Sequence, residues 1–307
     1  MGCMRNYLTE YRHELQRTFT GTSGTPPEWV PRLAEGNDAG YHLPGSAVWA
    51  VHGHVATIVA GIRVLLMQAL HPGALAGVYE HSGFQKDPLG RLANTVRWIF
   101  TVTYGSTEAA ESATAVVRRI HERVRGTYVD GHGTVHEYAA NDPELLRWVH
   151  VTYADSFLTA NRIWGTSIPG GADAYVSEWA AAGRLIGVQD PPLTEAQVRD
   201  ELEGWYASGI LRADERLAET VSFIQHPPLS PLLKPGYRIL FAAAVASLEP
   251  KYRDLLGLQR ARLGIVPLPV ITAARVVLGM VRFALGSHGP SELAARQRLQ
   301  RLGYADA

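Results

Sequence analysis

Histidine is the residue type in this chain best able to do chemistry. The 307 residues include twelve His, and several fall in segments whose apolar periodicity predicts a helix. A buried neutral imidazole offers a lone pair and is a common protein ligand for zinc or haem iron. The single cysteine, Cys3, can form neither an internal disulfide nor a paired-cysteine metal site. Any metal is therefore expected to be held by His or carboxylate groups, or within a cofactor.

Three histidines are candidate functional residues, and each has a structural alternative. His121 has Arg118 and Arg125 at helical spacing on its face, so its ring could meet a cofactor whose carboxylates the arginines bind. The alternative is a solvated basic face. His150 lies on the apolar face of the next helix, where the alternative to a ligand is a hydrogen-bonded core histidine. His71 precedes a proline and could cap the last carbonyls of a helix as a cation.

Common catalytic motifs do not occur in the sequence. There is no Gly-x-Gly-x-x-Gly after a strand, no P-loop, no His-Glu-x-x-His and no Gly-x-Ser-x-Gly. Dinucleotide binding, P-loop chemistry, zinc proteolysis and the common hydrolase triad therefore lack their usual support. Lys and Arg together number 29, as do Asp and Glu, so no basic excess favours nucleic acid as a partner.

Neither a secretory signal nor a transmembrane segment is expected. The N-terminus has no apolar stretch of the signal type, so we expect a cytoplasmic protein. The two most apolar segments, 55–70 and 270–285, are interrupted by Arg63 and by Arg275 and Arg282 respectively. Both fall short of the roughly 18 uninterrupted apolar residues of a membrane span. They predict helices, the second with either a core edge or a surface-seeking face.

Helical patterns that could position these histidines extend through almost the whole chain. Ser106 is typical of a helix start and Gly126 of its end, and Pro143 after an acidic residue begins the next helix. Residues 194–197 have the spacing of a capping box. Residues 127–138 predict either a short hairpin or an ordered loop. With no internal repeat, the economical expectation is a single all-α domain with a cofactor pocket between helices.

Four motifs occur in order along the first half of the chain. They are the run from His71-Pro72-Gly73 to Arg91-Leu92, Arg97 with Thr101, Arg118 with His121 and Arg125, and Asp142 to His150 with Asp155-Ser156-Phe157. Together they resemble the DUF2236 family, which groups the mpaB-type oxygenases with the latex-clearing rubber oxygenases. The resemblance covers residues 45–260. It leaves residues 1–44 as an N-terminal extension and residues 261–307 as C-terminal helices packed on the core.

The resemblance implies a distantly globin-like helical fold around haem b. His121 would be the proximal ligand of the iron. Arg97 and Thr101 would lie near the haem, and Arg118 and Arg125 would meet its propionates.

On the substrate side, the resemblance implies a base at Glu80, with the adjacent His81 as a competitor. Phe100 stands where the rubber oxygenases have a lysine that can close the sixth position of the iron, so a more accessible iron is expected here. His150 is the rival of His121 for the cofactor.

These features predict a haem b-dependent oxidoreductase. Dioxygen or peroxide would oxidise a C=C or C–H bond of a small, mainly apolar organic substrate. A haem-binding sensor or carrier without turnover is one alternative, and a haem-free helical member of the family is another. A Soret band separates the haem-free alternative from the other two, which oxygen or peroxide consumption with candidate substrates then separates.

Overall fold

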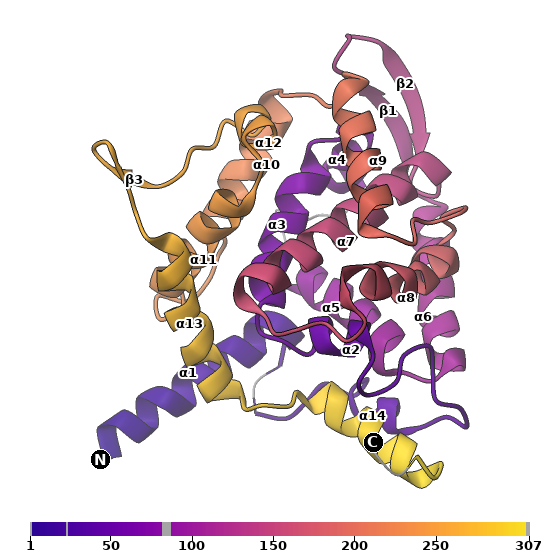
Figure 1. Ribbon diagram of the computed structural model, residues 1–307, viewed down its shortest axis with the longest axis vertical. Coiled ribbons are helices and arrows are strands. Elements are labelled where there is room, and N and C mark those ends of the chain that lie inside the picture. Colours follow the sequence, from indigo (N-terminus) through magenta and orange to yellow (C-terminus); the bar gives the residue numbers. More distant parts are fainter. Residues whose placement is uncertain (1, 23, 82–86, 305–307) are drawn as a thin grey trace.

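The chain folds into one helical body with two small hairpins, as the computed structural model in Figure 1 shows for residues 2–22, 24–81 and 87–304. The first helices are α1 (Gly2–Thr20), η1 (Pro31–Ala34), α2 (Ala47–His52), α3 (Thr57–Ala69), α4 (Pro72–His81), α5 (Pro88–Tyr104) and α6 (Thr107–His121). After a hairpin follow α7 (Pro143–Trp164), α8 (Gly171–Ile186), α9 (Glu195–Ala207), α10 (Glu215–Gln225), α11 (Lys234–Ser247), α12 (Pro250–Leu255), α13 (Val270–Leu285) and α14 (Pro290–Arg301). The predicted single all-α domain is confirmed.

The core is built around α3 and α7, which lie against each other in the middle of the molecule (Figure 1). Leu66 and Met67 of α3 and Trp148 of α7 are fully buried. The Trp148 indole donates a hydrogen bond to the Gln68 carbonyl at 3.2 Å. Because each helix is apolar on the face toward its neighbour, this contact removes a large apolar area from water and stabilises the fold.

A buried ion pair accompanies this apolar contact. Arg63 of α3 pairs with Asp155 of α7 and donates a second hydrogen bond to the Ser156 hydroxyl at 3.0 Å. The arginine that interrupts the apolar segment 55–70 thus faces α7 rather than solvent. A charged group is tolerated there because it is paired and hydrogen-bonded.

Local signals set most helix starts as expected. Ser106 caps α6 by accepting a hydrogen bond from the Ala109 amide at 3.2 Å. Thr194 and Gln197 form the predicted capping box of α9. The Asp142 carboxylate, however, accepts from the Ala139 amide at 2.7 Å and leaves the first turn of α7 without a side-chain cap.

The segment after α6 forms a hairpin. Strands β1 (Arg125–Val129) and β2 (Val135–Ala139) pair antiparallel, with Tyr128 opposite His136. This decides between the two alternatives for residues 127–138. A second, two-residue pair joins β3 (Arg262–Leu263) to β4 (Val266–Pro267).

The two ends of the chain pack onto the body and hold the terminal helices in place. The Arg12 side chain of α1 donates to the Ala284 carbonyl of α13 at 2.6 Å. Arg298 of α14 is buried and donates to the carbonyls of Leu33 at 2.6 Å and Tyr104 at 2.9 Å. These long-range bonds satisfy backbone carbonyls that would otherwise be buried without a partner.

Within the described residues no single helix is long and apolar enough to cross a membrane. Two pairs of helices reach the required length and hydropathy in combination, α3 with α4 and α13 with α14. The members of these pairs meet at angles of 105° and 53°.

Candidate functional site

The sequence-predicted site residues gather mainly where the ends of α4 and α6 meet the beginnings of α5 and β1. Helices α5 and α6 run antiparallel and are joined by a turn at Gly105-Ser106. The indole of Trp98 donates to the Thr114 hydroxyl at 3.0 Å and sets the level at which they pair. The His81 ring lies 2.9 Å from the Arg125 carbonyl and ties the end of α4 to β1. We call this place the α4–α6 junction.

His121 is the last residue of α6 and is half-buried at the junction. Its Nδ1 atom is buried and makes no hydrogen bond of standard geometry, but the Asn141 side chain, whose Oδ1 is buried in the same way, lies beside the ring. Burial lowers the pKa of His121, and the nearby Arg91 guanidinium lowers it further, although the Asn141 side chain opposes them. The ring is therefore neutral at pH 7, the state in which an imidazole nitrogen can donate a lone pair to a metal.

Glu80 and His81 end α4 at the exposed edge of the junction. Glu80 forms an ion pair with Arg216 of α10 at 2.8 Å. Burial, with the Glu80 carboxylate beside it, raises the pKa of Tyr138 to about 12. The His81 Nε2 faces a carbonyl, which can only accept, so Nε2 carries the proton and Nδ1 holds the lone pair.

A hollow of about 300 Å³ lies beside this edge, between α4 and β1. Its lining comes from α4, β1 and the segment leading into α10, namely Pro72, Leu75, Thr127, Tyr128, Val129, Arg212, Asp214 and Arg216. The volume is at the lower end of the range for small-molecule sites. Arg216 belongs both to this lining and to the ion pair with Glu80.

Arg118 and Arg125 do not share a helical face as the spacing predicted. Helix α6 ends at His121, five positions before Gly126, and Arg125 is the first residue of β1. Its side chain donates to the Glu122 carbonyl at 3.3 Å. Arg118 remains on α6 as an exposed residue one turn before His121. The helix stops early because the amides and carbonyls that follow join the hairpin, with the Ala140 amide donating to Val124.

Phe100 and Thr101 lie away from His121. His121 is seven residues past Thr114 on α6, and Phe100 is two residues past Trp98 toward the turn, so about 13 Å of helix separates their levels. Phe100 packs instead against Tyr104, with ring centroids 5.6 Å apart, in a cluster that includes Trp49.

Arg97 and Thr101 are bonded to each other through the backbone. The Thr101 hydroxyl donates to the Arg97 carbonyl at 2.7 Å, while the Arg97 side chain is exposed. The structure therefore brings Glu80 and His81 to the start of β1, where Arg125 follows His121 by four residues, and leaves Arg97, Phe100 and Thr101 farther along α5.

His150 is buried in the middle of α7, but it is not a hydrogen-bonded core histidine. Its Nε2 atom has no partner among the described residues. The ring packs against Gly183 of α8, where a Cβ would lie 2.9 Å from it. Burial, with the charges of Arg147 and Arg184, lowers the pKa of His150 to about 4. It is a neutral packing residue between α7 and α8.

His71 does not cap α3 as a cation. Its Nδ1 accepts a hydrogen bond from the Gly73 amide at 3.1 Å, so it caps the start of α4. Burial lowers its pKa to about 4, and the ring is neutral. Trp205 packs edge-on against it, with centroids 5.3 Å apart.

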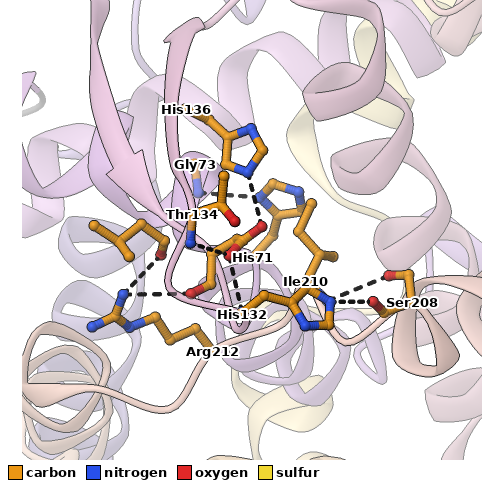
Figure 2. A network of polar contacts seen from close by, with 10 residues as sticks. His71, Gly73, His132, Thr134, His136, Ser208, Ile210 and Arg212 are labelled. Atoms are coloured by element: carbon orange, nitrogen blue, oxygen red, sulfur yellow. Dashed lines mark hydrogen bonds and ion pairs between the residues drawn. The ribbon is translucent and has the colours of Figure 1, made fainter.

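A polar network at the tip of the β1–β2 hairpin lies beside His71 and was not anticipated (Figure 2). The Asp130 carboxylate accepts from the amides of His132 at 2.9 Å and Thr134 at 2.8 Å, and from the His136 ring at 2.8 Å. The bond from His136 is the main cause that lowers the pKa of Asp130. The Asp130-Gly131 pair was the available signal, since Asp followed by Gly favours tight turns.

The same tip is docked on the segment between α9 and α10. The His132 ring donates to the Ser208 carbonyl at 2.7 Å (Figure 2). The Gly131 amide donates to the Ile210 carbonyl at 3.1 Å. A Cβ on Gly131 would lie 2.0 Å from the Gly209 carbonyl oxygen, so only glycine allows this approach. The network positions β1, which borders both the hollow and the junction.

Replacing Asp130 with Ala should loosen this hairpin tip. We expect the amides of His132 and Thr134 to exchange with solvent on the order of tenfold faster, because both lose their acceptor. Asp130→Asn is the matched control, since its amide oxygen can still accept from both. Hydrogen exchange followed by mass spectrometry measures the effect, and equal protection in the Ala variant and the parent would contradict this role.

Fold and junction together describe an all-α protein with a histidine-bearing site between helix ends. A family profile described as "ER-bound oxygenase mpaB/B'/Rubber oxygenase, catalytic domain" matches residues 49–282. The chain therefore belongs to this oxygenase family, which confirms the resemblance carried by the four motifs. No curated protein and no solved structure matches the chain. The likeness to globins stays a prediction.

Proposed function

We propose that this protein is a haem b-dependent oxygenase that acts on a small, mainly apolar organic substrate, and that His121 would hold the haem through its iron. The observation that carries the proposal is the position of His121, a half-buried ring that is neutral at pH 7 and lies within the residues that the oxygenase profile matches. Membership of the oxygenase family implies a small-molecule substrate and dioxygen. Peroxide is the alternative oxidant.

The chemistry of the residues at the junction fits a haem. His121 is neutral at pH 7, as an axial nitrogen ligand must be. Arg91 acts electrostatically on His121, and Arg118 precedes His121 by three residues on α6, so both could supply positive charge suited to propionate carboxylates. Within the described residues no group of three or more His, Cys, Asp or Glu side chains could hold a bare metal ion. A metal brought in by a porphyrin needs only one such side chain.

Haem, when bound, would supply the activation of dioxygen or peroxide, which amino-acid side chains cannot perform. The chain's own residues would then orient the substrate and move protons. His81 is the group we assign to proton uptake, at Nδ1, because its Nε2 is committed to the Arg125 carbonyl. Glu80, held by Arg216, would keep negative charge at the same edge.

The hollow beside α4 and β1 is the place we assign to the substrate. It combines aliphatic and aromatic lining with arginine and aspartate side chains at one side. Such a site would bind an apolar body and orient it by one polar group. Arg97, Phe100 and Thr101 do not line it, so the proposal gives them no contact with the substrate.

The purified protein should carry about one non-covalent haem b per chain, as expected for one axial histidine and no Cys-x-x-Cys-His attachment motif. Pyridine haemochrome analysis after reconstitution with haemin measures this ratio. A chain that takes up no haemin would contradict the proposal. Haem uptake without oxygen or peroxide consumption across an apolar substrate panel would indicate a sensor or carrier.

A further inference from the structure

The β3–β4 hairpin and the helix that follows expose an unusual amount of apolar surface. At the hairpin Leu263, Ile265 and Val266 are exposed, Ile265 to 92%. Figure 1 shows this hairpin extending away from the helical body on the side where α13 and α1 lie. An isoleucine so exposed at the end of a projecting loop contributes nothing to the core.

Helix α13 continues this apolar surface. Val276, Met280 and Phe283 follow one another at helical spacing on its outer face, and Phe283 is 74% exposed. With Tyr7 of α1 they line a groove of about 700 Å³ between α1, α11 and α13. The inner face of α13 packs through Val281 and Ala284 in one cluster with Leu15 of α1, so the outer face of α13 is not needed for packing.

The segment that carries this surface has more basic than acidic residues, in a chain whose net charge is zero. Residues 220–291 contain eight Lys or Arg and two acidic residues, Glu249 and Asp254. Residues 255–291 contain four Arg and no acidic residue. Arg262 and Arg282 are exposed and form no ion pair within the described part of the chain.

We propose that this surface docks on an anionic phospholipid bilayer without crossing it. The docking face consists of Ile265, Val266, Met280 and Phe283 with Arg262 and Arg282. Exposed apolar side chains beside cations fit the boundary between acyl chains and headgroups, where arginine stems lie along apolar surface and guanidinium groups reach the phosphates.

The charge pattern favours an anionic bilayer over a second copy of this chain as the partner of this surface. A second copy of this chain would bring the same arginines to the contact, and like charges would oppose each other there. An anionic bilayer supplies opposite charge across the whole face, and each Arg near such a surface adds about 1 kcal/mol of binding. Helix α1 brings two carboxylates to this side, Glu10, which is exposed, and Glu14, which is paired with Arg17 at 2.6 Å.

Vesicle flotation with the full chain tests the proposal. We expect binding to phosphatidylcholine vesicles that contain phosphatidylglycerol, much weaker binding to phosphatidylcholine alone, and loss of binding as salt is raised. Arg262→Gln and Arg282→Gln should each weaken partitioning about fivefold. The double variant Ile265→Ser/Phe283→Ser should weaken it by at least about tenfold, because apolar area no longer enters the interface.

Val135→Ser is the matched control. Val135 is 67% exposed on β2, which lies far from β3 in Figure 1, and its loss should leave vesicle binding unchanged. Absence of binding to anionic vesicles would overturn the proposal, as would equal binding to neutral vesicles that the arginine variants do not change. A dimer in light scattering that the double serine variant dissociates, without any vesicle binding, would show that the face joins two copies instead.

Discussion

Replacing His121 with Ala is expected to remove most of the haem from the protein. The substitution deletes the half-buried, neutral imidazole that ends α6 at the α4–α6 junction and that we propose as the ligand of the iron. Loss of an axial bond should weaken haem binding by at least about tenfold, the factor that corresponds to 1.4 kcal/mol. Soret absorbance per chain after gel filtration with haemin measures the loss.

Two further variants separate ligation from folding. His150→Ala removes the rival imidazole and should leave the Soret band in place, since His150 packs against Gly183 in the core. His121→Gly should regain haem when free imidazole is added, because the small ligand can occupy the vacated position. A normal spectrum for His121→Ala, with loss of haem in His150→Ala, would move the ligand to α7.

We expect this protein to lose stability as the pH falls from 6.5 toward 4, before most of its carboxylates are protonated. Burial lowers the pKa of His42, His71 and His150 to about 4 each, whereas the same rings titrate near 6.5 in the unfolded chain. Their stabilising effect is therefore complete above pH 6.5, declines as the pH falls toward 4 and is lost below it. Each ring contributes up to about 3 kcal/mol across that interval.

Together these contributions rival the whole stability of an ordinary domain, about 5–15 kcal/mol. Urea unfolding followed by circular dichroism from pH 7.5 to 4.5 should show a steadily falling midpoint. His71→Asn keeps an acceptor for the Gly73 amide and removes one titrating ring, so its pH dependence should be shallower. A midpoint that does not change over this range would contradict the neutral, buried state of the three histidines.

The helical character of the chain was predictable from local sequence. Ser106 and the Thr194–Gln197 box begin helices because each side chain reaches amides within its own first turn. The apolar segment 270–285 became α13 with the same bounds. Interactions between residues a few positions apart need no knowledge of the rest of the fold, and sequence spacing describes them fully.

The end of α6 was not predictable in this way. Gly126 was the nearest residue that favours a helix end, yet α6 stops at His121 because residue 124 bonds to Ala140 and β1 pairs with β2. The residues after His121 pair with β2, more than ten residues away, and therefore do not form another turn of α6. Arg125 consequently left the face it was expected to share with His121.

The candidate site shows the same division between local and tertiary causes. Spacing alone placed Arg97 and Thr101 one turn apart. The four ordered motifs by themselves identified the oxygenase family, and the role of His121 within it stays a prediction. Only the pairing of α5 with α6 decided that Phe100 lies about 13 Å along the helices from His121. Which imidazoles are neutral, and which nitrogen lacks a partner, also depended on the fold. Burial and hydrogen bonding are set by residues distant in sequence, and no local pattern encodes them.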